Sequence, residues 1–181
     1  FQDEVPAGLE QAPAQSPAPA EAASWPATVA PTEAFTLHSR PGSQRVLFLD
    51  FDGHEIVGTA WNTTSSSRTA PPFSIDADPL AFSETERGAV IDVWRRVAQD
   101  FAPFDVDVTT QDPGQDAITR SGPGDLLFGS RVLISPDARQ ALCGCGGQAY
   151  VGVFDTAYSH GYYQPAWVYP QGLANNSKYI A

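Results

Sequence analysis

Basic residues and long apolar runs are both scarce in this sequence of 181 residues. Ten lysines and arginines stand against 21 aspartates and glutamates, which gives a formal net charge of −11. Binding to nucleic acid or to an anionic membrane surface needs clustered positive charge, so neither is expected as the main partner. The longest apolar run covers residues 46–49, far below the ~20 residues that a membrane span requires. No membrane span is therefore expected.

Cysteine and histidine, two common zinc ligands, are also rare. Cys143 and Cys145 flank one glycine, and two sulfurs alone do not complete a structural zinc site, which takes four ligands. They could pair with each other, pair with cysteines outside this chain or stay free. Since cysteine pairs in extracellular proteins are usually oxidised, we expect a disulfide. The three histidines are His38, His54 and His160, and no two of them are four residues apart, as ligands one helical turn apart would be.

Residues 1–42 differ in composition from the rest of the chain. They hold seven of the sixteen prolines, mixed with Ala, Gln, Glu and Ser. Such a segment buries too little apolar surface to offset its chain entropy, so extended or disordered chain is expected. A pro-segment, a linker and a plain tail all fit this composition. The segment begins without an apolar h-region, so we expect Phe1 to be a processed or engineered terminus. We place the folded domain at 43–181.

The folded part predicts one long helix among several strands. Residues 45–52 include four consecutive apolar side chains, typical of a strand buried on both faces. Ser83 and Glu86 fit a capping box, and apolar residues at helical spacing predict a helix over 83–102 that Pro103 ends. Further strands are predicted at 105–110, 131–134, 148–154 and 166–169, and a Ser/Thr/Pro-rich loop at 62–78. This order predicts an α/β fold, a mixed and mostly parallel twisted sheet of about five strands with the helix packed on it.

The segment after the first strand resembles the first motif of haloacid-dehalogenase-like phosphatases. In that family the first aspartate of Asp-x-Asp-Gly attacks phosphorus and the second handles the proton, while magnesium neutralises the phosphate. Asp50 and Asp52 would take these roles here. The sequence departs from the family because His54 follows the glycine and because Lys178, the only lysine, lies in a polar loop. A phosphatase is therefore the alternative hypothesis.

Two groups of carboxylates could bind a cation. Asp50 and Asp52 with His54 are weak candidates for a metal site, with calcium as the ion if the carboxylates act alone. The other interpretation is structural, with both carboxylates accepting hydrogen bonds from the following turn. Asp105 and Asp107 project from one face of a predicted strand, and we interpret them as surface carboxylates.

A tyrosine-rich stretch near the end of the chain allows two interpretations. Its large rings could line a substrate subsite, or they could cover the core below a neighbouring strand. The rings in question are Tyr158, Tyr162, Tyr163 and Trp167.

Residues 147–152 read Gly-Gln-Ala-Tyr-Val-Gly and resemble the Gly-x-Ala-Tyr-Val-Gly edge strand of reprolysin-like metzincins. In that family the strand forms the upper rim of the cleft, and its unpaired backbone groups can pair with an extended peptide. Residues 37–62, 93–110 and 162–170 are similar to segments of a bacterial branch of secreted metallopeptidases. The resemblance implies that Gly147, Gln148, Ala149, Tyr150, Val151 and Gly152 bind substrate.

The resemblance also implies the fold and the chemistry of a secreted zinc endopeptidase. Residues 43–181 would form the three-layer upper subdomain of its catalytic domain, with a peptide or protein as substrate. The family binds zinc through His-Glu-x-x-His-x-x-Gly-x-x-His and hydrolyses the peptide bond with zinc-activated water. That motif is missing here, and residues 176–181 resemble the first turn of its helix. We therefore expect the zinc ligands in a C-terminal half outside this chain, and expect this chain alone to be inactive. A non-catalytic binding domain is the remaining alternative.

Overall fold

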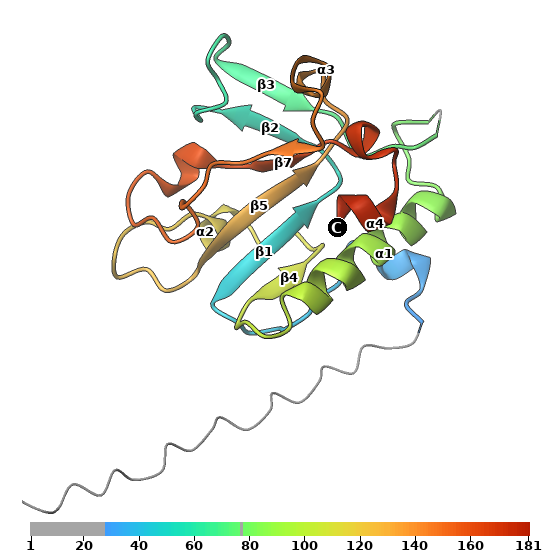
Figure 1. Cartoon of the computed structure of the whole chain (residues 1–181). Helices are drawn as coiled ribbons and strands as arrows, with labels where there is room; N and C mark the ends of the chain where they lie inside the picture. Colours follow the sequence, from blue (N-terminus) through green and yellow to red (C-terminus); the bar gives the residue numbers. More distant parts are fainter. Residues whose placement is uncertain (1–27, 77) are drawn as a thin grey trace, which may run out of the picture.

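A central sheet of five strands organises the computed structural model, which describes residues 28–76 and 78–181 (Figure 1). The strands follow the order β4-β1-β5-β7-β6. The first four are parallel, and β6 pairs with β7 in the antiparallel sense. Their bounds are β1 Arg45–Asp50, β4 Asp107–Thr109, β5 Phe128–Ile134, β6 Gly147–Gln148 and β7 Ala166–Val168. The predicted α/β class with a mixed, mostly parallel sheet of about five strands is confirmed.

Strand β1 lies inside the sheet and is buried on both faces. Its four consecutive apolar residues leave no polar face for solvent, so both faces need a cover. Leu47 and Leu49 belong to the cluster under the long helix, while Val46 and Phe48 pack on the opposite side. Neighbouring β5 approaches closely at Gly129, where a Cβ would lie 2.1 Å from the carbonyl oxygen of Val46.

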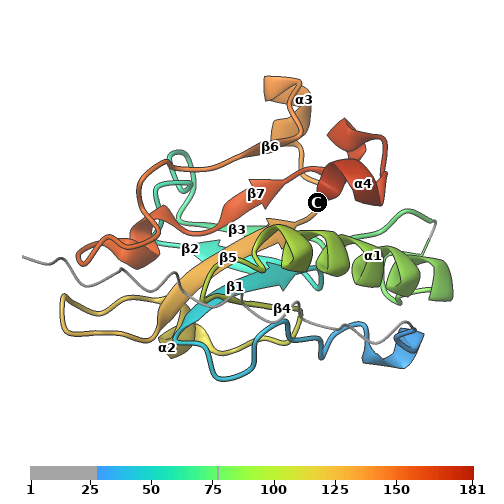
Figure 2. The same cartoon turned by 60° about the horizontal axis from the view of Figure 1, so that its bottom comes forward.

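Helix α1, Glu84–Asp100, covers one face of the sheet together with α4, Ser177–Ile180 (Figure 2). The predicted capping box is present, because the amide of Glu86 donates to the Ser83 hydroxyl and the Glu86 carboxylate accepts from the Ser83 amide. Glu86 also accepts from the amide of Ile75, so it fixes the incoming loop as well as the first turn. The helix start is therefore determined by local residues, as predicted.

The opposite face of the sheet is covered by a hairpin and a short helix. The hairpin joins β2, His54–Val57, to β3, Ser67–Ala70, and α2 spans Gln115–Ile118. Ile56 and Ala70 of the hairpin pack on Trp167 of β7. The predicted loop over 62–78 is wrong for residues 67–70, since this polar segment gains its strand geometry only by pairing with β2.

The remaining elements are short. They are α3 Arg139–Cys143 and the 3₁₀ helices η1 Pro31–Glu33, η2 His160–Tyr163 and η3 Pro170–Leu173. No helix in the described ranges is long and apolar enough to cross a membrane.

Residues 28–42 of the predicted tail pack against the domain. Ala34 is fully buried and Leu37 is 8% exposed, and both belong to the core under α1. The expectation of extended or disordered chain for 1–42 is therefore wrong for residues 28–42, because apolar side chains of this segment are buried in the core. Residues 1–27 lie outside the described range.

Two predicted strands are shorter in the structure. The strand predicted over 148–154 is wrong beyond its start, because β6 covers only Gly147–Gln148. The strand predicted over 105–110 is limited to β4, Asp107–Thr109. Strand length depends on the partner, and β7 offers β6 only three residues.

Asp107 is buried and ties the N-terminal segment to β4, which corrects its interpretation as a surface carboxylate. Its Oδ1 accepts hydrogen bonds from the amides of Ser39 and Arg40, each at 2.9 Å. Its Oδ2 lies 2.6 Å from Nδ1 of His38, whose Nε2 contacts Gln111 at 3.0 Å. Burial of His38 opposes its charge, but the hydrogen bonds and the Asp107 charge outweigh burial and raise its pKa.

The raised pKa of His38 predicts a pH-dependent contribution to stability. The folded state holds the proton more tightly than the unfolded chain, so the contribution is complete below the ordinary histidine value of 6.5 and is lost as pH rises through the folded pKa. We expect His38→Ala to lower the free energy of unfolding more at pH 5.5 than at pH 8.5, measured by urea denaturation. An equal loss at both pH values would contradict this contact.

Candidate functional site

Strand β6 is the open border of the sheet. Gly147 pairs with Val168 and Gln148 with Trp167, and no described strand pairs with the other side of β6. A Cβ at Gly147 would lie 2.4 Å from the carbonyl oxygen of Trp167, so only glycine permits this approach. The predicted site residues thus begin on an unprotected sheet edge.

The residues after β6 continue this edge without regular pairing. Within the described part of the chain, the amides of Ala149, Tyr150 and Val151 donate no main-chain hydrogen bond. Val151 is 96% exposed and Tyr150 is 38% exposed. Gly152 closes the segment in a turn at a φ of +73°, which favours glycine. Because alternate residues of an extended chain face the same side and Gln148 pairs toward β7, the unpaired amides of Ala149 and Val151 are the ones that face the free border.

An uncharged groove of about 410 Å³ lies beside this edge. None of its lining side chains carries a charge. They come from the loop after β2, from α3 and from the border segment, and are Ala60, Trp61, Thr63, Leu142, Cys143, Gln148 and Tyr150. Aromatic rings form one wall of the groove and continue beyond it. Ring centroids are 4.8 Å apart for Trp61 and Tyr150, and 5.2 Å apart for Tyr150 and Tyr163.

Hydrogen bonds fix the groove walls to the rest of the fold. Trp61 donates from Nε1 to the carbonyl of Pro165 at 2.9 Å, and the amide of Ala60 donates to the carbonyl of Tyr162 at 2.7 Å. The Tyr169 hydroxyl donates to Oε1 of Gln148 at 3.0 Å. The first two bonds join segments about a hundred residues apart in sequence, so the groove is a product of the tertiary fold.

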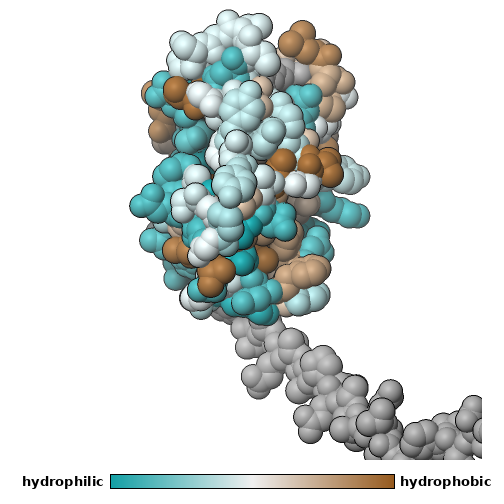
Figure 3. Space-filling view, turned by 90° about the vertical axis from the view of Figure 1, so that its left-hand side faces the viewer, coloured by the Kyte–Doolittle hydropathy of each residue, from teal (hydrophilic) through white to brown (hydrophobic). Residues whose placement is uncertain are grey.

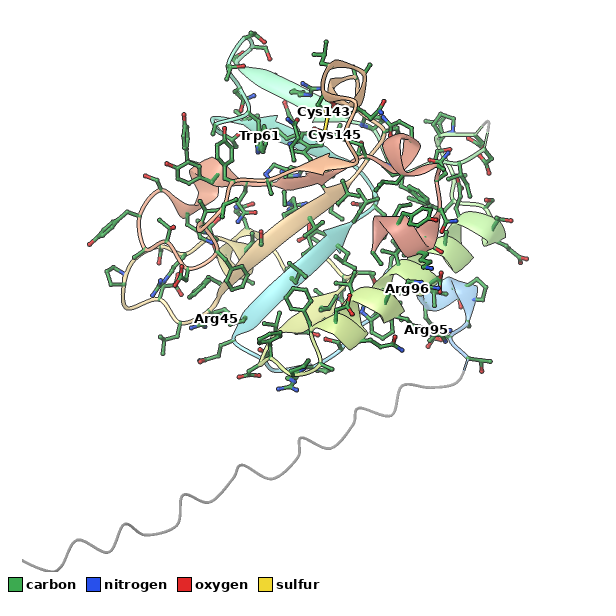
Figure 4. All side chains as sticks on the ribbon, in the orientation of Figure 1. Arg45, Trp61, Arg95, Arg96, Cys143 and Cys145 are labelled. Atoms are coloured by element: carbon green, nitrogen blue, oxygen red, sulfur yellow. A yellow bond between two sulfur atoms is a disulfide. The ribbon has the colours of Figure 1, made fainter. Side chains whose placement is uncertain are left out.

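Cys143 and Cys145 are joined by a disulfide close to Trp61 (Figure 4), and Cys143 lines the groove. Gly144 between them has a φ of +59°. Cys145 packs on the hairpin cluster, while the neighbouring Leu142 is 88% exposed. The disulfide therefore links an exposed wall of the groove to the turn that leads into β6.

The aromatic residues predicted near the end of the chain separate into two groups. Trp167 is 2% exposed and belongs to the core. Tyr158 and Tyr162 are exposed, and Tyr162 stacks edge-on against Tyr163. On the side of the molecule that carries these tyrosines, apolar side chains form separate small groups among pale and polar ones (Figure 3). Sequence reasoning missed Trp61, because its contact with Tyr150 spans 89 positions.

Asp50 is a structural carboxylate at the end of β1. Its side chain is fully buried and its Oδ2 accepts a hydrogen bond from the guanidinium of Arg131, which is 7% exposed. Burial, and then the nearby Asp52 carboxyl, raise the pKa of Asp50 to about 7 although the Arg131 charge opposes this. A nucleophile must reach phosphorus, so a buried and paired Asp50 gives the phosphatase alternative no support.

The histidines and carboxylates of the described residues are not gathered into one cluster of potential metal ligands. No group of three potential ligands is present within the described ranges, and Asp52 is exposed while Asp50 is buried. Burial, with the charge of Arg131, lowers the pKa of His54 to about 4. His160 is buried, with its Nδ1 accepting from the amide of Arg120 and its Nε2 contacting the carbonyl of Phe154. Among the described residues, these side chains do not form a zinc ligand set.

Comparisons with protein-family models, with curated proteins and with solved structures find no match. Arguments about function therefore depend on the border strand and the groove. Both features follow from the geometry of the chain itself.

Removing Arg131 is expected to destabilise the fold strongly. In Arg131→Met the Asp50 carboxylate stays buried without its counter-charge, which costs about 3–5 kcal/mol. The loss, measured by chemical denaturation, should be larger at pH 8.5 than at pH 5.5, because Asp50 can take up a proton at the lower pH.

Arg96→Met is the matched control for this change. Arg96 pairs with Asp92 on the surface of α1, and both side chains are more than 40% exposed (Figure 4). Its loss should cost no more than about 0.5 kcal/mol. Similar losses for the two variants would show that the Asp50–Arg131 pair has no special role.

Proposed function

We propose that this chain is the upper part of the catalytic domain of a secreted zinc metallopeptidase of the metzincin type. The observation that carries the proposal is the open antiparallel border strand β6 on an otherwise parallel sheet. The resemblance of residues 147–152 to the substrate-binding edge of reprolysin-like enzymes supports the same role. Peptide or protein substrates would bind there in extended form.

Main-chain pairing is the chemistry that this edge supplies. An extended peptide could pair with main-chain groups of Ala149 and Val151, the alternate residues of this edge that face away from β7. Such pairing gives affinity without selecting one sequence, which suits an endopeptidase. It also holds the peptide straight beside the sheet. This chain's own contribution is thus to bind and orient the substrate.

In the proposal the zinc ligands belong to polypeptide outside these 181 residues. Bound zinc would supply an activated water for hydrolysis. A hollow of about 250 Å³ lies on the helix-covered face between α1 and the sheet, beside Ile180 and Ala181. Apolar side chains such as Leu49, Val97 and Val132 line it. A longer helix that continues from α4 could fill this hollow. This supports the proposal that a C-terminal half packs on the helix-covered face of the sheet.

The zinc part of the proposal is tested in the encoding gene. We expect the reading frame to continue past Ala181 and to encode His-Glu-x-x-His within about one further helix. The two histidines of this motif are four residues apart, so both can bind one zinc ion. The encoded full-length protein should then bind one zinc and cleave peptides, and should lose activity with a chelator. A frame that stops, or continues without paired histidines, would leave only a binding domain.

The edge part is tested with Ala149→Pro. Proline removes an amide that has no partner within the described residues, so folding should be retained while one hydrogen bond to an added strand is lost. We expect an extended peptide to bind about tenfold more weakly, measured by calorimetric titration.

Leu80→Ala is the control, because it changes a side chain that is 93% exposed and lies outside the border segment. Its affinity should match that of the unmodified chain. Equal binding by Ala149→Pro, with its fold verified by circular dichroism, would contradict main-chain pairing at this edge.

A further inference from the structure

We propose that the groove beside β6 is a side-chain subsite that selects extended peptides with a bulky uncharged residue, aromatic or aliphatic. The inference rests on the proposed function, because the peptide must first pair with the border strand. It adds to the proposed function the chemical class of the peptide side chain that the groove selects. Three features of the groove support it: its position, its lining residues and the arrangement of its aromatic rings.

The groove lies on the face of the sheet to which a bound peptide would direct every second side chain. Gln148 pairs directly with Trp167, so the two side chains share the hairpin-covered face. Gln148 and Tyr150 both line the groove. A peptide strand added to the free edge would continue the same alternation, with side chains on this face about 7 Å apart. One of them would meet Tyr150 and Trp61.

The lining determines what that side chain can be. A charged group would meet no opposite charge among the lining side chains and would exchange part of its hydration for apolar contact, which is unfavourable. Leu142 and Tyr150 instead offer exposed apolar surface that a large side chain could cover. The volume of about 410 Å³ leaves room for an aromatic ring. Bulky uncharged residues are therefore favoured over small and charged ones.

The ring geometry favours a peptide side chain over a flat sugar ring. Trp61 and Tyr150 are tilted by 54°, and Tyr150 and Tyr163 by 58°. The rings therefore form ridges, with no continuous flat platform on which a sugar could stack. A side chain can insert between ridges of this kind. Hydrogen bonds to Pro165 and Gln148 hold the walls before any peptide binds.

The test uses four capped eight-residue peptides that differ at one central position. The flanking residues are threonines, and the central residue is Phe, Ala, Asp or Lys. With the 181-residue chain we expect the Phe peptide to bind about tenfold more tightly than the Ala peptide, and the Asp and Lys peptides to bind no better than Ala. Titration followed by calorimetry gives the four dissociation constants.

Leu142→Asp is the decisive variant. Leu142 is 88% exposed, so the change should not affect folding, but it places a charge in the groove. We expect the Phe preference to fall to about twofold and the Lys peptide to bind better than the Asp peptide. Leu80→Asp, at a side chain 93% exposed and outside the groove lining, should behave like the unmodified chain.

The outcomes separate this inference from the proposed function. If Ala149→Pro weakens all four peptides but the unmodified chain binds Phe and Ala equally, the subsite is wrong and the border-strand role stands. If no peptide binds, both are overturned. A Phe preference that persists in Leu142→Asp also overturns the subsite. Binding of an oligosaccharide in the groove, lost in Leu142→Asp, would overturn it in favour of a sugar site.

Discussion

Burial of β1 on both faces is the constraint on which the rest of the structure depends. Its neighbours β4 and β5 occupy both of its edges, and its two faces are covered by α1 on one side and by Ile118 of α2 on the other. Once β5 and β7 extend the parallel sheet, β6 is left at the border. Strand β6 runs antiparallel to β7, and residues 149–165, which include η2, return the chain from one to the other. An open edge beside a fixed groove is thus a consequence of how the core is closed.

Local sequence patterns correctly predicted the elements that nearby residues determine. The helix over 83–102 follows from its own capping box and apolar stripe, and β1 follows from four consecutive apolar residues. The errors concern elements that a distant partner defines. Strand β3 at Ser67–Ala70 is polar and pairs only because β2 lies opposite. Asp107 alternates like a surface residue, yet it is buried because a segment about 68 positions earlier brings its amides to the carboxylate.

The candidate site could be predicted in part for the same reason. The glycines at 147 and 152 mark a border segment in the sequence, while its length depends on β7. The groove has no sequence pattern, because Trp61 and Tyr150 meet only in the folded chain. Asp50 belongs to the most recognisable local motif in the sequence, yet its side chain is buried and accepts a hydrogen bond from Arg131. A motif that follows a strand indicates chemistry only when its side chains reach solvent, and this depends on tertiary packing.

The central claim is that residues after β6 offer unpaired main-chain groups to an extended peptide. Residue-resolved amide hydrogen exchange, with and without the Phe-containing peptide, tests this most directly. The account predicts fast exchange at Ala149 and Val151 in the free chain and slow exchange after the peptide is added. Amides of β1 should be protected in both states, since they lie inside the sheet. Protection of these two border amides before any peptide is present, or slowing by the peptide only elsewhere, would contradict the account.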